Sequence, residues 1–441
     1  MKKKHRQYGS VFELNGIPGF SQLLPLSLQH LVAMIVGCVT PALIVSGEAG
    51  LGQIDRVMLV QASLVIAAIS TIIQVFPIAG KLGSGLPMIL GVSFAYLPTL
   101  QAIAGSYDIA TILGAQLIGG ICAIIVGIFV KRLRILFPPL ITGTVVFTIG
   151  LSLYPTAVNY MAGGKGSGSY GSWKNWLVAI FTLVVVTVLN HFCKGIFKLA
   201  SILFGIIAGY LAALCLGMID FAGVGEAGIL QMPGVMHFGI KFEFSSIVAM
   251  SILFVINSVQ AIGDFTATTT GGLDREPTDT ELQGGIVAYG VTNILGSFLG
   301  GLSTATYSQN VGIVGTTKVV NRMVFGLTAV LMLFAGVIPK FSAMLTTIPQ
   351  CVLGGATISV FASIAMTGLK LIFQEPMNYR SSSIVGLSVA LGMGLTQVSD
   401  SLAKFPSWVD TIFGKSPVVL ATLAAILLNQ VLPCKKDGEQ Q

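Results

Sequence analysis

Two ionisable side chains lie within apolar runs of this chain, and they are the first candidates for chemistry. Asp264 lies in INSVQAIGDFTAT (256–268), and His30 lies in LSLQHLVAM (26–34). An ionisable group inside a membrane-spanning segment is costly, so such groups usually face a cavity or an ion pathway. For both residues the simpler interpretation is a buried side chain with a structural hydrogen bond.

Neutral polar side chains add to this pattern. Gln260 precedes Asp264 by four residues, about one helical turn, so both side chains face the same side of a helix. The segment 302–317 carries hydroxyl and amide groups at Ser303, Thr304, Thr306, Ser308, Gln309 and Asn310. Amides donate and accept hydrogen bonds in one plane, which suits an uncharged or weakly charged planar ligand. Phe94 could stack on such a ring, or simply pack in the core.

Signals of a soluble enzyme or a metal site are missing from the sequence. The stretch GSGLPMILG lacks the Lys-Ser/Thr pair of a phosphate-binding loop, and the six cysteines are scattered without a CxxC pair. The net charge of +7 fits basic cytoplasmic loops and does not require a nucleic acid partner. We therefore expect no catalytic residue, no metal and no cofactor. A secondary carrier or a facilitator remains, with a channel or a ligand-sensing receptor as the alternative from another class.

Composition places these residues in a polytopic, all-α membrane protein. Of 441 residues, 54% are hydrophobic and 9% are charged, against about 25% charged in soluble domains. A spanning helix needs about 20 mostly apolar residues. That criterion predicts fourteen segments, with approximate limits 22–46, 54–78, 84–104, 108–130, 138–160, 174–192, 197–219, 246–270, 283–300, 302–317, 322–340, 347–373, 381–398 and 416–433.

Charge placement and internal repetition predict the topology. With both termini in the cytoplasm, 17 of the 24 lysines and arginines lie on the cytoplasmic side, as expected for a bacterial inner membrane protein. Fourteen segments divide into two sets of seven, and an odd number forces the two repeats to be inverted. The third segment of each repeat, at 83–99 and 300–312, is glycine-rich and interrupted. Such matched interruptions indicate a binding site near the midplane, although both could be ordinary helices with packing glycines.

Four blocks of sequence carry a resemblance to a known family. The stretch QNVGIVGTTK (309–318) reads Gln-Asn-x-Gly, four residues, then Thr-Lys, and three further blocks follow in order: LQHLVAM (28–34), GVSFAY (91–96) and QAIGDFTAT (260–268). Together they resemble the nucleobase–ascorbate transporter family of nucleobase:cation symporters. The similarity extends over essentially the whole chain.

This resemblance implies an architecture. A core domain would comprise segments 1–4 (21–135) and 8–11 (221–340), and a gate domain segments 5–7 (136–220) and 12–14 (341–433). Cytoplasmic termini at 1–20 and 434–441 would flank them. Segments 3 and 10 would contain short antiparallel strands, and homodimers would form through the gate domain within the lipid bilayer.

The resemblance also implies roles for individual residues. Gln309 would hydrogen-bond the base and Phe94 would stack on it, while the backbone at Ser93 and Ser308 would contact it. Asn310 would support the site, and His30, Asp264 and Tyr289 would belong to the coupling network. A signature that opens with glutamine is similar to that of xanthine and uric acid carriers, so the expected activity is symport of a purine-type nucleobase by elevator-like alternating access.

Two positions depart from the family pattern. The eighth-segment glutamate that usually binds the base is Gln260 here, and an aspartate common in the ninth segment corresponds to Tyr289. Both changes remove a group that can take up a proton. The coupling ion is therefore left open between H⁺ and Na⁺, and an uncoupled facilitator remains an alternative. A sulfate-permease-type anion transporter on the same fold is a further alternative, and the 309–318 signature argues against it.

Overall fold

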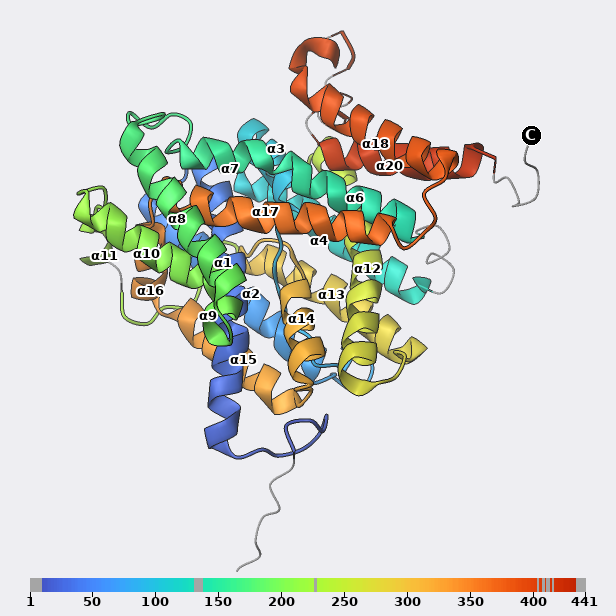
Figure 1. The fold of residues 1–441 in the computed structure, drawn as a ribbon, viewed down its shortest axis with the longest axis horizontal. Coiled ribbons are helices and arrows are strands. Elements are labelled where there is room, and N and C mark those ends of the chain that lie inside the picture. The colour runs from blue at the N-terminus through green and yellow to red at the C-terminus, as the bar shows by residue number, and fades with distance from the viewer. Residues whose placement is uncertain are drawn as a thin grey trace, which may run out of the picture.

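The computed structural model describes residues 10–130, 138–225, 228–402, 404–406, 409, 413–414 and 416–433, and helices dominate it (Figure 1). Residues 1–9 of the expected N-terminal tail and the whole expected C-terminal tail (434–441) lie outside these residues. In chain order the elements are α1 (Phe20–Glu48), α2 (Gln53–Val75), β1 (Leu90–Val92), α3 (Leu97–Ser106), α4 (Ile109–Ile128), α6 (Pro139–Ser152), α7 (Tyr154–Met161), α8 (Trp173–Phe192), α9 (Ile196–Leu199), α10 (Ser201–Cys215), α11 (Ala222–Gly225), α12 (Phe244–Leu273), α13 (Asp279–Leu299), β2 (Thr304–Thr306), α14 (Ser308–Thr317), α15 (Arg322–Val337), α16 (Pro339–Thr346), α17 (Gln350–Ile372), α18 (Tyr379–Gln397) and α20 (Pro417–Val431).

Long apolar helices make this an integral membrane protein. Among the described residues, eight helices are long and apolar enough to span a bilayer, and nine if the bent pair α15–α16 is counted as one span. The expected fourteen segments are thus not all long helices. Those at 84–104 and 302–317 each contain a three-residue strand followed by a ten-residue helix.

Prolines mark two changes in the course of the helices. Within the predicted segment 138–160, α6 ends at Ser152 and α7 begins at Tyr154 with Pro155 in its first turn, and Pro139–Met161 still counts as one candidate span. The predicted segment 322–340 corresponds to α15, and Pro339 at its end begins α16, which is bent by 79° from α15. Proline has no N–H and its ring clashes with the preceding turn, so a helix readily restarts there in a new direction.

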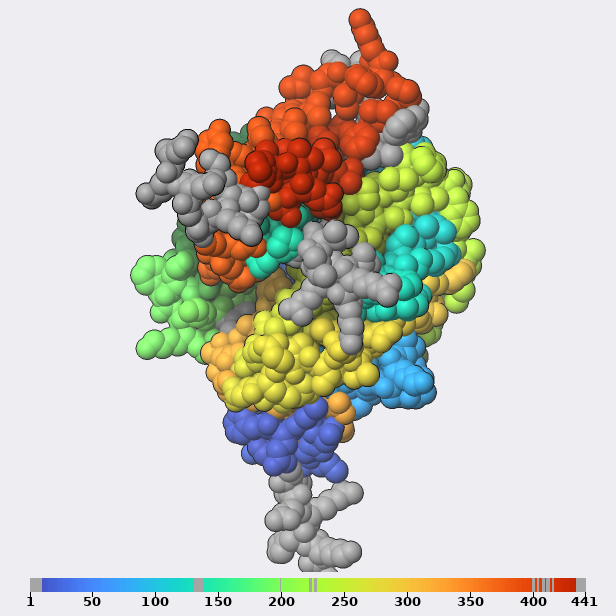
Figure 2. Space-filling model, turned by 90° about the vertical axis from the view of Figure 1, so that its right-hand side faces the viewer, coloured from blue at the N-terminus to red at the C-terminus, as the bar shows by residue number. Residues whose placement is uncertain are grey.

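The helices pack mainly within two groups. One group contains α1–α4 and α12–α15 with both strands, and the other contains α6–α10, α17, α18 and α20. In Figure 1, α6 and α17 run side by side across the upper half, above α12–α15. Figure 2 shows α18 and α20 (orange to red) at the top of one face, α12 and α13 (yellow) below them, and the first described residues (blue) at the bottom. Contacts between the groups are comparatively few.

The two strands form an antiparallel pair whose outer edges are closed by side chains. Leu90 pairs with Thr306 and Val92 with Thr304. On the β1 edge, the Leu90 N–H donates to Thr71 Oγ1 of α2 (3.1 Å), and that hydroxyl donates back to the Leu90 carbonyl (3.0 Å). On the β2 edge, Asn293 of α13 accepts from the Thr304 N–H (2.8 Å). Unpaired backbone groups are not tolerated at membrane depth, so these bonds allow non-helical chain in the protein interior.

Glycines allow the closest helix crossings. A Cβ on Gly120 of α4 would lie 2.8 Å from the Gly290 carbonyl oxygen of α13. In the other group, a Cβ on Gly368 of α17 would lie 2.2 Å from the backbone nitrogen of Phe147 in α6. Small residues at such crossings let helix backbones approach in membranes, where no hydrophobic force drives association.

Candidate functional site

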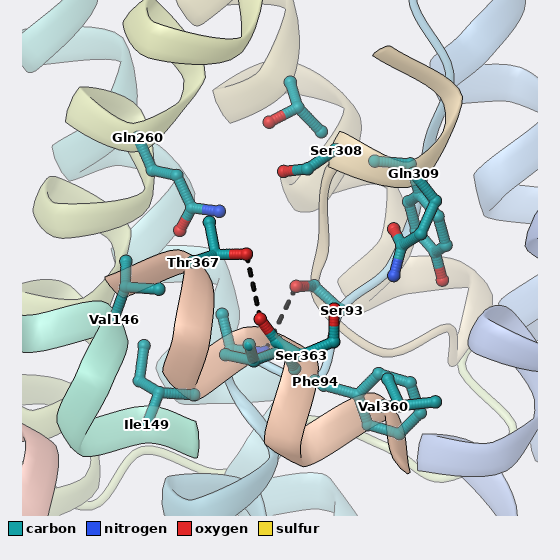
Figure 3. A pocket seen from close by; sticks show the side chains of 14 residues that line it. Ser93, Phe94, Val146, Ile149, Gln260, Ser308, Gln309, Val360, Ser363 and Thr367 are labelled. Atoms are coloured by element: carbon teal, nitrogen blue, oxygen red, sulfur yellow. Dashed lines mark hydrogen bonds between the residues drawn. The ribbon is translucent and has the colours of Figure 1, made fainter. Parts of the chain in front are cut away.

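A cavity of about 210 Å³ lies where the two groups of helices meet (Figure 3). The strand-bearing segments and α12 form one wall, and α6 and α17 form the other. The lining residues are Ser93, Phe94, Ala95, Gln260, Thr306, Tyr307, Ser308 and Gln309 on the first wall, and Val146, Ile149, Val360, Ser363, Ile364 and Thr367 on the second.

Two glutamine amides and one aromatic ring converge on this cavity. Gln260 points toward it from α12, and Gln309 lies on the far side in the first turn of α14 (Figure 3). Phe94, which follows β1, packs edge-on against Phe361 of α17 with ring centroids 5.3 Å apart. A planar ligand here would meet an aromatic surface and in-plane donors and acceptors.

Two serines bring further polar groups to the same wall. The Ser93 hydroxyl accepts from the Ala95 N–H (3.2 Å), and the Ser93 N–H donates to the Ser303 carbonyl (3.2 Å). Within the Ser93 backbone, which is expected to contact substrate, the N–H is engaged in extending the strand pair. Ser308 begins α14, and the first-turn N–H groups of a helix have no intrahelical acceptors and carry partial positive charge.

Asp264 lies one layer behind the cavity. Its two carboxylate oxygens accept hydrogen bonds from Thr306 Oγ1 (2.5 Å) and Ser308 Oγ (2.9 Å), and both of these residues line the cavity. The carboxylate therefore links α12 to the β2–α14 segment. Any change in its charge would be transmitted directly to the hydroxyls that face a ligand.

Asn310 and His30 form a second buried link. Asn310 Nδ2 lies 3.0 Å from His30 Nδ1 and also donates to the His30 carbonyl (3.2 Å). The imidazole ring packs against Phe325 with centroids 4.6 Å apart. Neither residue lines the cavity. They fix the start of α14 against α1, which positions Gln309.

Tyr289 lies apart from this network. Its side chain is buried, its hydroxyl contacts the Tyr96 hydroxyl, and its ring lies 5.6 Å from Phe254. It does not line the cavity. Tyr289 thus packs from α13 against Phe254 of α12, and its hydroxyl pairs with that of Tyr96, the residue before α3.

The whole second wall is absent from the sequence-based site. Ser363 and Thr367 are four residues apart in an otherwise apolar part of α17, a spacing that could have marked a polar face. Val146, Ile149 and Val360 carry no such signal, because an apolar residue in a membrane span is expected anyway.

Comparison with known proteins adds independent information. A model of the permease family matches residues 21–401. The xanthine permease of Bacillus subtilis is 34% identical over 94% of this chain and 94% of its own length, and the uric acid permease PucK of the same organism is 33% identical over 95% and 97%. The murine Solute Carrier 26 family member A9 anion transporter, solved in its inward-facing state, covers 93% of this chain with a TM-score of 0.62. This chain covers 68% of that protein, and the identity of 12% makes the likeness one of fold alone.

Proposed function

The chain belongs to the permease family, whose members are transporters and not enzymes, and we propose that its substrate is a purine-type nucleobase such as xanthine or uric acid. The observation that carries the proposal is the convergence of Gln260, Gln309 and Phe94 on one cavity at the interrupted segments. Two amides on opposite sides can hydrogen-bond the edges of a flat heterocycle, and the ring supplies a stacking surface.

The proposed topology is fourteen segments in two inverted repeats, in a bacterial plasma membrane with both termini in the cytoplasm. The matched positions of the two strand–helix segments and of their edge-closing residues Thr71 and Asn293 support the repeats. We propose that the two packing groups are the core domain (21–135 and 221–340) and the gate domain (136–220 and 341–433), although α16, at the start of the second gate segment, packs on α2 and α15. Their sparse mutual contacts suit one group moving past the other, as elevator-like alternating access requires. Homodimerisation would use the gate domain.

Coupling to an ion gradient would run through Asp264, supported by His30. The carboxylate is tied to two residues of the cavity wall, so binding of H⁺ or Na⁺ there would alter the hydroxyls presented to substrate. Gln260 cannot titrate, which leaves Asp264 as the carboxylate next to the cavity. An uncoupled facilitator would show uptake that never exceeds the external concentration.

An anion transporter is the second candidate, because the N-terminal turn of α14 faces the cavity and favours negative charge. No Lys or Arg side chain lines the described cavity, however. Competition of xanthine uptake by unlabelled uric acid, sulfate and bicarbonate separates the two. Displacement by sulfate or bicarbonate at concentrations where uric acid fails would contradict the nucleobase proposal.

The first test is thermal stabilisation of the purified protein by a panel of free nucleobases, with and without Na⁺. A ligand that binds only the folded state stabilises it by about 2.7 kcal/mol at a hundredfold excess over Kd. We expect a clear rise in melting temperature with one or two purines, and an unchanged temperature with sulfate. Dependence of that rise on Na⁺ would identify sodium as the coupling ion.

A further inference from the structure

A second, larger cavity lies farther along the boundary between the two helix groups. It measures about 570 Å³ and lies beside Glu48, at the end of α1 that is distant from the N-terminal residues. Three parts of the chain contribute residues to both cavities, with different residues at each cavity. They are Phe94 with the following α3, the α6–α7 pair, and α17, which contributes Val360 to Thr367 at the central cavity and Gln350 at the outer one. The two cavities therefore lie at different heights along the same boundary.

Side-chain contacts link the two helix groups at this boundary. Thr99 Oγ1 of α3 lies 2.9 Å from Ser416 Oγ, which directly precedes α20. The Tyr160 hydroxyl of α7 donates to the Ile44 carbonyl of α1 (3.3 Å). Together with the edge-on Phe94–Phe361 pair, these contacts join the two helix groups along the boundary on which both cavities lie.

Neutral amides and hydroxyl groups make up most of the polar lining of the outer cavity. Gln101, Asn159, Gln350 and Gln397 all line it, whereas its described charged lining residues are Glu48 and Lys165, of opposite sign. A site for an inorganic anion would need an excess of positive charge. The amides instead repeat the chemistry of Gln260 and Gln309 in the central cavity.

The carbonyl oxygens of three of these amides are already directed elsewhere. Gln101 Oε1 accepts from Thr156 Oγ1 (3.2 Å), and Asn159 Oδ1 accepts from the Tyr170 hydroxyl (2.8 Å). The Gln350 carbonyl packs so closely on Gly164 that a Cβ there would lie 1.4 Å from it, while its Nε2 lies toward Gly47. Among the described residues no acceptor faces the NH₂ groups of Gln101, Asn159 and Gln350, so these donors are available to a ligand. Three donors suit a ligand whose edge carries carbonyl oxygens.

We propose that the outer cavity is a second, weaker binding site for oxopurines, which holds substrate before it reaches the central site. This inference rests on the proposed function, because it assumes the same class of substrate. Phe94 at the central cavity precedes Gln101 at the outer cavity by seven residues, and α3 begins between them. Substrate would be recognised first through its carbonyl oxygens and only then sealed between the two central glutamines.

The test is equilibrium dialysis of the purified full-length protein with radiolabelled xanthine, which counts sites. The natural chain is expected to bind two xanthines, one at least tenfold more weakly. Gln101→Glu keeps an acceptor for the Thr156 hydroxyl but replaces the NH₂ donors with a carboxylate oxygen. It should abolish the weak site and leave the tight Kd within about twofold (~0.4 kcal/mol). Asn159→Asp is the second variant, in case Gln101→Glu fails to fold. It likewise keeps an acceptor for the Tyr170 hydroxyl and replaces the NH₂ donors with a carboxylate oxygen.

Two controls separate recognition by the amides from effects on the contacts between the two helix groups. Thr99→Val removes the hydroxyl contact with Ser416 and keeps all four amides, so two sites should remain. Gln53→Leu removes an exposed amide that bonds Thr346 and does not line this cavity, and it should change nothing. A single site in the natural chain, or two sites untouched by both acidic variants, overturns the outer site while the transporter proposal stands. No xanthine or uric acid binding at all overturns the nucleobase proposal itself, and the outer site with it.

Discussion

The two walls of the central cavity are built by different physical means. The wall made by α12, β2 and α14 is held by hydrogen bonds between segments: Asp264 fixes Thr306 and Ser308, and Asn310 fixes His30. The wall made by α6 and α17 is held by close backbone contact at Gly368. One of its hydroxyls bonds within its own helix, since Thr367 Oγ1 donates to the Ser363 carbonyl (2.9 Å) (Figure 3).

This difference separates recognition from sealing. Irregular backbone frees N–H and C=O groups and needs side chains to satisfy them, so polar chemistry concentrates on the first wall. Two regular helices packed through glycines satisfy their own backbone and present a smoother, mostly apolar surface. Such a surface can move past a ligand without breaking a specific hydrogen bond.

The largest expected effect comes from breaking the backbone contact of the second wall. Gly368→Leu would force a side chain against Phe147 backbone atoms, which cannot rotate away. We expect destabilisation of about 3 kcal/mol or more, the upper range for overpacking, seen as loss of a monodisperse peak and a large fall in melting temperature in detergent. Gly386→Leu in α18 is the matched control, since a Cβ there meets nothing within 4 Å. Equal stability of the two variants would contradict the packing argument.

Removing the recognition amide should affect binding more than folding. Gln309→Ala leaves ligand atoms without partners, at about 1–3 kcal/mol for a buried group, so xanthine affinity should fall roughly 10- to 100-fold at about 1.4 kcal/mol per factor of ten. Titration calorimetry measures it. Ser363→Ala on the opposite wall serves as comparison and should stay within about threefold (~0.7 kcal/mol). If both variants weaken binding equally, recognition is not confined to the first wall.

Changing the charge behind the first wall should uncouple transport while sparing most binding. Asp264→Asn keeps one oxygen acceptor for Thr306 or Ser308 but cannot take up a proton. We expect xanthine affinity within about fivefold (~1 kcal/mol), no accumulation against a gradient in proteoliposomes, and retained xanthine exchange at equal concentrations. Accumulation at the natural level, at every pH and Na⁺ concentration, would remove Asp264 from the coupling mechanism.

The smallest effect should come from a hydroxyl of the second wall. Thr367→Val preserves shape and removes a group that already bonds within α17. Xanthine affinity and uptake should change by less than about twofold (~0.4 kcal/mol), measured beside Thr306→Val, which severs the bond to Asp264 and should reduce uptake more. The comparison of the walls fails if Thr367→Val proves the more damaging of the two.

Sequence alone determined the class of the protein and indicated one wall of the candidate cavity. Low charge and long apolar runs require lipid around the chain, since so few charges cannot cover a water-facing surface. Two features of the sequence indicated where substrate would lie: the interrupted segments at 83–99 and 300–312, and the polar residues around Gln260 and Gln309. Polar groups are costly within a membrane span, so they usually mark a functional site.

Tertiary structure alone decided which residues complete the cavity and how the polar groups are shared. Val146, Ile149 and Val360 are indistinguishable in sequence from lipid-facing residues, and only the approach of α6 and α17 turns them toward the site. The sequence likewise grouped Tyr289 with Asp264, whereas packing pairs it with Tyr96. Helical periodicity fixes the face on which a side chain lies, but the partner that this face meets depends on contacts between segments far apart in the chain.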